Sequence, residues 1–315
     1  MPHRYAGAMT ISTDLRLGRS EWGLLGLLSL LWGGSFFFAK IAVAEIPPLT
    51  LVAGRVGIAT MFLLLALQLC RVAMPRGWKL WLSFLAMGAL NNVVPFGLLF
   101  WGQTRIDSGL ASILNAFTPI FAVVAAHVLT ADEKLDLRRG VAVLIGIAGV
   151  VLTIGPDALG DLGGNLAAEM ACLAATLSYA LAGIYGRRFR GLPPISVAAG
   201  QLCGAAVLCV PLALALEAPW QIAVPSRIAL GALLGLALIS TAAAYVIYFR
   251  ILARAGATNL LLVTFLIPIC AILLGFLFLH EALALNQFLG MATIGGALVL
   301  IDGRLLPRGP ALPPT

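Results

Sequence analysis

Long apolar stretches separated by short polar connections dominate the pattern of this sequence. The hydrocarbon core of a bilayer requires about 20 apolar residues per helix, and shorter spans are tolerated. The pattern therefore predicts ten transmembrane helices, at approximately 22–44, 48–70, 78–101, 109–129, 140–155, 166–186, 194–216, 228–249, 258–279 and 287–301.

The beginnings of three stretches carry further information. The stretches 48–70 and 194–216 follow Pro-Pro pairs, which suit the entry into a helix. Arg16 and Arg19 precede the first stretch, and Ala42-Val43-Ala44 near its end imitates a signal-peptide cleavage site. This stretch is longer than the usual apolar region of a signal peptide and contains Lys40, so we interpret it as a retained helix.

The amino-acid composition indicates that these helices lie in lipid rather than in water. Of the 315 residues, 61% are hydrophobic and 10% charged, whereas soluble domains have roughly 45–50% apolar and about 25% charged residues. The excess predicts an all-α integral membrane protein. The five cysteines lie inside apolar stretches without CxxC spacing, so we expect neither disulfides nor a metal site.

The basic residues alternate between the two sides of the predicted topology. Sixteen of the 20 Lys and Arg residues fall on one side, whereas the connections of the other side hold Arg105 and Arg227. The positive-inside rule then places both termini in the cytoplasm. The net charge of +7 is therefore explained by topology and by attraction to anionic lipid, so no nucleic-acid partner is expected.

The chain lacks the sequence features of two other classes of membrane protein, ATP-driven transporters and intramembrane enzymes. The chain has no GxxxxGK[ST] motif for ATP, and its three histidines are scattered, without the clustered nucleophile, base or metal set of an intramembrane enzyme. We expect no enzyme activity and no cofactor.

The two halves of the chain resemble one another. WGGSFFFAK at 32–40 aligns with 179–187, and PPLTLVAGR at 47–55 aligns with PPISVAAGQ at 193–201, at offsets of 147 and 146 residues. Pro119 aligns with Pro268 at an offset of 149. Each half has an odd number of predicted spans, so the repeats enter the membrane in opposite senses, as in many secondary transporters.

The predicted organisation is therefore two inverted five-helix repeats with short terminal segments. The predicted parts are a cytoplasmic N-terminal segment at 1–21, a first repeat at 22–155, a second repeat at 156–302, and a cytoplasmic tail at 303–315.

The order and spacing of these motifs resemble the EamA-type members of the drug/metabolite transporter superfamily. WGGS with its following lysine, PPLTLVAGR, STAAAYVIYFRILARAGAT at 240–258, and the stretch from Pro268 to Glu281 with the Gly-rich last helix carry the resemblance, which covers nearly all of 22–302. It implies a ten-helix inner-membrane transporter, often an exporter of amino acids or other metabolites, here in a plasma membrane and, by composition, bacterial.

Polar residues inside the spans are the candidate substrate contacts. A side-chain amide facing lipid leaves its donors and acceptors unsatisfied, so Asn91, Asn92 and Asn115 should face the interior or a wet cavity. Asn92, Phe96 and Leu99 share one face of the third helix, and their repeat partners are Thr241, Tyr245 and Tyr248. Interhelical packing is the alternative role. The predicted set is Asn91, Asn92, Phe96, Trp101, Asn115, Tyr179, Thr241, Tyr245, Tyr248, Thr264 and Phe38.

Lys40 and Arg55 place charge within predicted spans, where charge is costly and often functional. Either residue can hold an anionic substrate group, snorkel, or cap the carbonyls of a neighbouring helix. The repeat partner of Arg55 is the neutral Gln201. Pro119 and Pro268 are candidate hinges, with a static kink as the alternative, and Glu133 and Glu281 are candidate solvated helix caps.

The predicted function is secondary transport, as an exporter of small metabolites such as amino acids, by alternating access through a central cavity. No midplane carboxylate is visible, so facilitated or weakly proton-linked movement of neutral or zwitterionic solutes is expected. The alternatives are an organic-anion or nucleotide-sugar transporter using Lys40 and Arg55, or a cation-drug efflux protein. The sequence leaves monomer and homodimer open.

Overall fold

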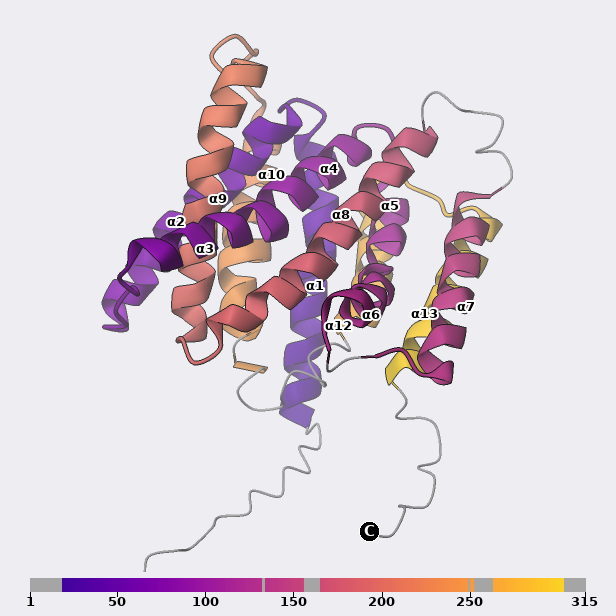
Figure 1. Cartoon of the computed structure of the whole chain (residues 1–315). Helices are drawn as coiled ribbons and strands as arrows, with labels where there is room; N and C mark the ends of the chain where they lie inside the picture. The colour runs from indigo at the N-terminus through magenta and orange to yellow at the C-terminus, as the bar shows by residue number, and fades with distance from the viewer. Residues whose placement is uncertain (1–18, 132–133, 156–164, 249, 252–262, 303–315) are drawn as a thin grey trace, which may run out of the picture.

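The computed structural model describes residues 19–131, 134–155, 165–248, 250–251 and 263–302, and these ranges contain helices and no strands (Figure 1). The predicted terminal segments 1–21 and 303–315 therefore lie wholly or mostly outside the described residues, as does Glu133. The helices are α1 (Arg19–Ala42), α2 (Pro48–Leu69), α3 (Trp78–Gly88), η1 (Ala89–Val93), α4 (Val94–Gln103), α5 (Ser108–Asn115), α6 (Thr118–Leu129), α7 (Leu137–Ile154), α8 (Asn165–Tyr185), η3 (Gly186–Phe189), α9 (Pro194–Glu217), α10 (Arg227–Leu234), η4 (Gly235–Ala243), α12 (Val263–Leu279) and α13 (Leu285–Asp302).

Within the described ranges, eight helical stretches are long and apolar enough to cross a membrane, and two more apolar helices, Leu266–Leu279 and Leu285–Ile301, are shorter. All ten stretches overlap the ten predicted spans, although the predicted ninth span starts at 258, outside the described residues. Large apolar side chains point outward on many helices; Met61 is 72% exposed and Leu144 is 68% exposed. Such a surface suits contact with lipid chains.

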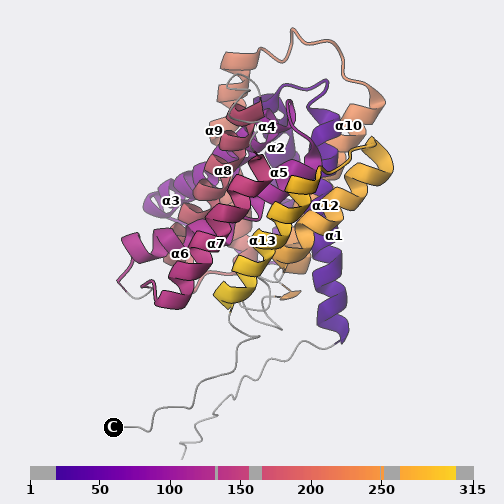
Figure 2. The ribbon, with the colours of Figure 1, turned by 90° about the vertical axis from the view of Figure 1, so that its right-hand side faces the viewer.

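Helices from the first part of the chain pack against helices from the second part. The packed pairs are α1 with α12, α2 with α9, α3 with α9, α4 with α8, and α7 with α13. Figures 1 and 2 both show α7 and α13 side by side at one edge of the bundle. The start of α1 and the end of α13 lie at the same end of the molecule, the lower end in Figure 1.

Glycines allow α3 and α9 to approach closely. A Cβ atom added at Gly88 would overlap the backbone of α9 at Gln201, Gly204 and Ala205, and one added at Gly204 would overlap the backbone of α3 at Phe84. Small residues at helix contacts are the usual means of tight packing in membranes.

We expect Gly88→Ala to destabilise the protein, since backbone atoms cannot move aside as a flexible side chain can. Overpacking typically costs about 1–3 kcal/mol, which exceeds the roughly 1 kcal/mol gained from better helix propensity. Thermal unfolding in detergent should show a lower Tm. Gly231→Ala in α10, where an added Cβ meets nothing within 4 Å, should not lower it; equal Tm values for the two variants would contradict the packing argument.

The two prolines predicted to be equivalent have different settings. The fourth predicted span is broken after Asn115, and Pro119 lies in the first turn of the next helix, α6. In a first turn the missing N–H has no partner to lose. Pro268 lies inside α12, where it removes a hydrogen bond from a continuing helix. Pro119 therefore interrupts no hydrogen bond of its helix, whereas Pro268 does. A hinge role for either proline stays a prediction.

Candidate functional site

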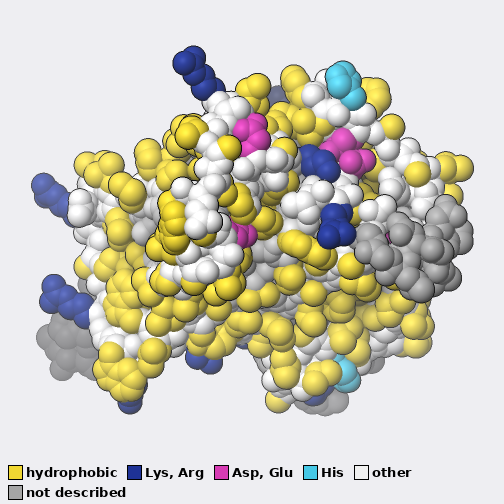
Figure 3. Space-filling model, turned by 90° about the horizontal axis from the view of Figure 1, so that it is seen from above, with side chains coloured by type: hydrophobic (Ala, Val, Ile, Leu, Met, Phe, Trp, Pro, Cys, Tyr) yellow, Lys and Arg dark blue, Asp and Glu magenta, His cyan; other side chains and the backbone are white. Residues whose placement is uncertain are grey.

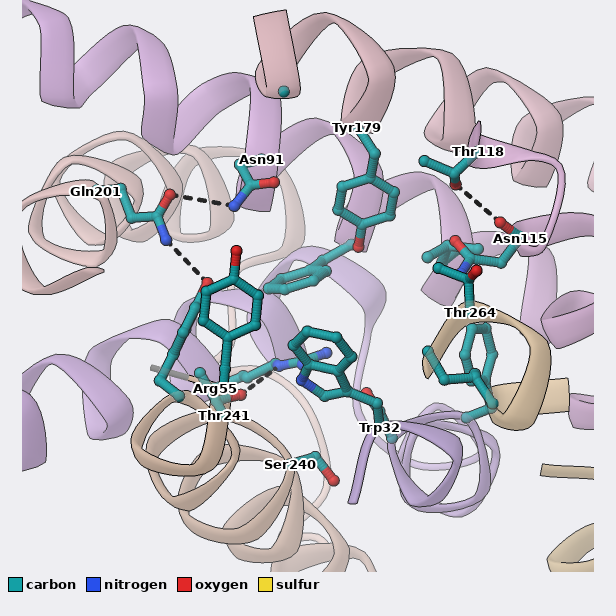
Figure 4. A pocket seen from close by; sticks show the side chains of 18 of the residues that line it. Trp32, Arg55, Asn91, Asn115, Thr118, Tyr179, Gln201, Ser240, Thr241 and Thr264 are labelled. Atoms are coloured by element: carbon teal, nitrogen blue, oxygen red, sulfur yellow. Dashed lines mark hydrogen bonds between the residues drawn. The ribbon is translucent and has the colours of Figure 1, made fainter. Parts of the chain in front are cut away.

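A cavity of about 470 Å³ lies in the centre of the helix bundle. Its described lining comes from α1, α2, α3, η1, α4, α5, α6, α8, η3, α9, η4 and α12, so both halves of the chain contribute to it. Figure 4 shows aromatic side chains and side-chain amides pointing into the space from opposite sides. A volume of this size is typical of a small-molecule site.

Arg55 is the charged residue among the described residues that line the cavity. It extends from α2 and is 5% exposed. Its Nε donates a hydrogen bond to Thr241 Oγ1 at 3.0 Å, and its guanidinium carbon lies 3.8 Å from the centre of the Phe96 ring and 5.8 Å from that of Phe100. The cation is therefore held by one hydroxyl and two aromatic faces.

Gln201, the repeat partner of Arg55, joins a second polar group. Its Oε1 accepts a hydrogen bond from Asn91 Nδ2 at 3.1 Å, and its Nε2 donates to Tyr245 Oη at 2.8 Å. Figure 4 shows this chain of three side chains along one side of the cavity. It links η1, α9 and the helix that follows η4.

Aromatic rings form much of the remaining wall. Trp32 and Tyr248 have ring centres 5.8 Å apart, Phe96 and Tyr179 6.4 Å apart, and Tyr245 and Tyr248 6.3 Å apart. Offset and edge-to-face arrangements at these separations are attractive, so the rings support one another. They offer flat apolar surfaces with polar edges.

Across the cavity from Arg55 lies a neutral polar patch made by Asn115, Thr118 and Thr264 (Figure 4). Thr118 Oγ1 donates to the backbone carbonyl oxygen of Asn115 at 2.8 Å. Within the described part of the chain, Asn115 Oδ1 and Ser240 Oγ are buried without a hydrogen-bond partner. Both residues belong to the described lining of the cavity.

Two π-helical segments, η1 and η4, lie beside this cavity. At the repeat offset of 149, residues 89–93 correspond to 238–242, which fall inside η4. In η4 the Thr241 hydroxyl donates to the carbonyl oxygen of Leu236, five residues earlier, at 2.8 Å. Short π-helical segments often occur at functional sites because their wide turns displace side chains and backbone groups.

Most of the predicted substrate contacts line the cavity. They are Asn91, Phe96, Asn115, Tyr179, Thr241, Tyr245, Tyr248 and Thr264, together with the possible charge contact Arg55 and the predicted hinge Pro268.

Five other predicted residues are not among the described lining of the cavity: Phe38, Lys40, Asn92, Trp101 and Pro119. Asn92 is fully buried, and neither polar atom of its amide has a partner among the described residues. Trp101 is 37% exposed and lies under the guanidinium of Arg105, with the guanidinium carbon 5.3 Å from the ring centre. Phe38 packs where α1 meets Gly235.

Lys40 caps a helix end. Its Nζ donates to the carbonyl oxygens of Gln103 at 3.1 Å and Ile106 at 2.8 Å, and lies 3.8 Å from Asp107 Oδ1. A cation at the C-terminus of α4 is favoured by the helix dipole and by the unpaired carbonyls there. Of the three roles considered for Lys40, which are substrate binding, snorkelling and capping, these contacts correspond to capping.

Several lining residues were not singled out from the sequence as contacts. For Gln201 and Ser240, alignment of the repeats supplied a signal, because their partners Arg55 and Asn91 were candidates. Trp32 lies in the WGGS motif, whereas the others are apolar or small residues without a distinguishing pattern. The set includes Trp32, Phe100, Gln103, Ser112, Thr118, Gln201 and Ser240.

At the end of the bundle away from the start of α1, three glutamates each cap a helix that belongs to the other half of the sequence. Glu45 accepts hydrogen bonds from the Ser226 amide and hydroxyl at the start of α10. Glu217 accepts from the Leu49 amide at 2.9 Å and the Thr50 amide at 2.6 Å. Carboxylates are favoured at helix N-termini.

Glu281 forms the third of these caps. It accepts from the Ser108 amide at 3.0 Å, the Ser108 hydroxyl at 2.6 Å and the Gly109 amide at 3.2 Å. This agrees with the predicted capping role, although the capped helix, α5, is distant in sequence. Figure 3, seen from this end, shows acidic and basic side chains close together among apolar ones.

The hydrogen bonds from the Ser226 side chain and backbone hold the pKa of the Glu45 carboxyl below its ordinary value of 4.5. A lowered pKa means that the contact favours the ionised carboxylate. Its stabilising effect is therefore present above the ordinary pKa and is lost as the pH falls through the lowered one.

Apolar helices of membrane-spanning length around a central, largely aromatic cavity define the class of multi-pass membrane transporters. The EamA-like transporter family model matches residues 21–155 and again residues 166–302. The chain belongs to the EamA-like transporter family.

Two similar proteins carry transporter names. The uncharacterized transporter YoaV of Bacillus subtilis (strain 168) is 28% identical over 280 residues, which cover 86% of this chain and 93% of YoaV. The uncharacterized inner membrane transporter YedA of Escherichia coli (strain K12) is 29% identical over 302 residues, 93% of this chain and 94% of YedA. These relatives support a multi-pass protein of the inner membrane.

A solved crystal structure of another protein shares the fold. It is 20% identical to this chain, with a TM-score of 0.64, and the match covers 92% of this chain and all of the other. At this identity the likeness concerns the fold alone.

Proposed function

We propose that this protein is a secondary transporter that exports small organic metabolites, amino acids among the candidates, by alternating access through the central cavity. The proposal includes ten transmembrane helices as two inverted five-helix repeats, with both termini in the cytoplasm. The main support for this proposal is the lining of the cavity, to which equivalent positions of the two repeats both contribute.

Four of the repeat-related pairs of lining residues illustrate the symmetry of the cavity. Each pair joins residues at offsets of 146–149, and both members line the same space: Arg55 with Gln201, Asn91 with Ser240, Phe96 with Tyr245, and Asn115 with Thr264. A pseudo-twofold axis through the cavity explains this arrangement. Two half-folds related by such an axis can exchange inward and outward shapes around a fixed site.

The helix contacts follow the same relation. In the first repeat Arg55 of α2 reaches Thr241 of η4, and in the second repeat Gln201 of α9 reaches Asn91 of η1. Each repeat thus extends one helix to the π-helical segment of the other. We propose that these wide-turn segments, beside the substrate, absorb the backbone change between the two states, in addition to the predicted hinges Pro119 and Pro268.

The two ends of the bundle differ in a way that supports an inward-facing state. The glutamate caps tie the halves together at the end away from the start of α1, and the positive-inside rule predicts that this end faces the outside of the cell. The cavity lining extends along α8 and η3 through Gly183, Gly186 and Phe189, toward the opposite end. In this state a solute enters from the cytoplasm, as an exporter requires.

A counterflow screen in proteoliposomes tests the function, using labelled amino acids, a sugar nucleotide and an organic cation. We expect uptake of at least one labelled solute that saturates and depends on the same solute inside the vesicle. Uptake that rises linearly with concentration would indicate a channel and would contradict alternating access. Protein-free vesicles are the control for leakage.

A further inference from the structure

We propose that the Arg55 side of the cavity is a subsite for the carboxylate of a small monoanionic acid, and that the aromatic wall beside it takes a flat apolar group of the same solute. The inference rests on the proposed transport function and names the substrate class of its cavity. It departs from the neutral or zwitterionic solutes expected from the sequence.

The unpaired charge of Arg55 is the first argument. The guanidinium is 5% exposed and uses Nε for Thr241, whereas its two terminal nitrogens have no hydrogen-bond partner among the described residues. One hydroxyl and two ring faces hold the guanidinium, but the described lining gives its charge no carboxylate counter-ion, and a buried charge without one is costly. A carboxylate can accept from both terminal nitrogens at once, which is the strong geometry for this pair.

The remaining lining limits the charge of the solute to one. The described lining contains no Asp or Glu to pair with an ammonium group and no second cation besides Arg55. A phosphate group carries about −1.5 to −2 charges at neutral pH, and a sugar nucleotide has two phosphates, so either would leave negative charge uncompensated. A carboxylic acid that is otherwise uncharged matches the single cation.

The aromatic rings suggest what lies beyond the carboxylate. Phe96 lies against the guanidinium, and the ring centre of Tyr179 is 6.4 Å from that of Phe96. Trp32 and Tyr248, with ring centres 5.8 Å apart, form a separate aromatic pair in the same lining. Flat apolar groups pack favourably between such faces and edges. At the far side, Asn115, Thr118 and Thr264 suit a neutral polar group.

The other repeat supplies a natural control for the charge. Gln201, at the position equivalent to Arg55, is accommodated in the same fold with partners Asn91 and Tyr245. The fold therefore tolerates a glutamine at this place in a repeat. Arg55→Gln removes the charge and keeps a side chain that can still donate to Thr241.

The test uses four solutes that share a phenyl ring and differ in charge: 3-phenylpropionate, phenylalanine, phenethylamine and 3-phenylpropan-1-ol. Binding to the full-length protein in detergent is measured by titration calorimetry. Charge-assisted hydrogen bonds discriminate by about tenfold or more, so we expect wild type to bind 3-phenylpropionate at least that much more tightly than the other three.

We expect Arg55→Gln to weaken 3-phenylpropionate binding by about 30-fold or more, because a buried partner of the anion is lost. Arg55→Lys should retain part of the affinity. Arg105→Gln removes an exposed arginine outside the described cavity lining and should leave binding unchanged. Thermal unfolding of each variant identifies a loss of fold; if Arg55→Gln does not fold, discrimination among the four solutes by wild type decides.

Wild type that binds the acid no more tightly than the alcohol overturns the subsite, as does a folded Arg55→Gln variant with unchanged affinity for the acid. Failure of the subsite is separable from failure of the proposed function. Saturable counterflow of some other solute, without preference for the acid, leaves transport standing. Selective binding of the acid without counterflow of any solute contradicts transport and leaves the subsite standing.

Discussion

Gly183→Trp should lower counterflow by about tenfold or more, since the indole ring takes up space that the solute needs and a loss of about 1.4 kcal/mol in binding is already tenfold. Gly183 lies in α8 among the described lining residues, and a Cβ added there meets nothing within 4 Å. Gly183 is exposed and borders the cavity of about 470 Å³, so a new side chain there has open space around it beside the cavity. Counterflow of whichever solute the screen identifies is the measurement.

Gly231→Trp is the matched control for this prediction. Gly231 in α10 is exposed, is absent from the described cavity lining, and an added Cβ there also meets nothing within 4 Å. We expect this variant to transport as wild type does, with both variants unfolding near the wild-type Tm. If Gly183→Trp also transports at the wild-type rate, the cavity is not the route of the solute.

Span positions were predictable because hydropathy and helix-start chemistry act locally. The stretches 48–70 and 194–216 correspond to Pro48–Leu69 and Pro194–Glu217, where proline occupies the first turn. The break between α5 and α6 lies within one predicted span, at 109–129, and was not predicted. Hydropathy averaged over a span hides the polar residues Asn115 and Thr118, and the sequence marked this place only through Pro119, as a candidate hinge or static kink.

The location of polar side chains inside the protein was predictable, since lipid offers no hydrogen bonds. The sequence did not predict which of the adjacent residues Asn91 and Asn92 lines the cavity. Sequence spacing placed Asn92 on the face of Phe96, as in a regular α-helix, whereas the described cavity lining has Asn91, five residues before Phe96. The wide turn of η1 makes residues five apart neighbours.

The equivalent segment of the second repeat, η4, has contacts that a sequence pattern does not record. In η4 the Thr241 hydroxyl hydrogen-bonds the Leu236 carbonyl oxygen and also accepts from Arg55 of another helix. The Thr241 hydroxyl thus combines a local bond with a tertiary contact, and no local periodicity records the second. The same holds for Lys40 and Glu281, whose polar ends were recognised but whose partners lie more than 60 residues away.

Locking the end of the bundle that carries the glutamate caps should stop transport. In a variant without the five native cysteines, Glu281→Cys and Ser108→Cys can be joined by a short bis-methanethiosulfonate, which forms a disulfide with each thiol and releases sulfinate. If the two repeats rock against each other, this end must open in each cycle. We expect counterflow to fall by about tenfold or more and a reducing agent to restore it.

A cross-link within one repeat distinguishes locking from general damage. Lys40→Cys with Asp107→Cys replaces an ion pair, 3.8 Å between Nζ and Oδ1, that joins α1 to the connection between α4 and α5. Under rigid-body rocking this distance does not change between states, so the bridge should leave counterflow within about twofold of the reduced protein. Undiminished counterflow with the Glu281–Ser108 bridge closed would mean that these ends stay together throughout the cycle, and the caps would then be static ties between the repeats.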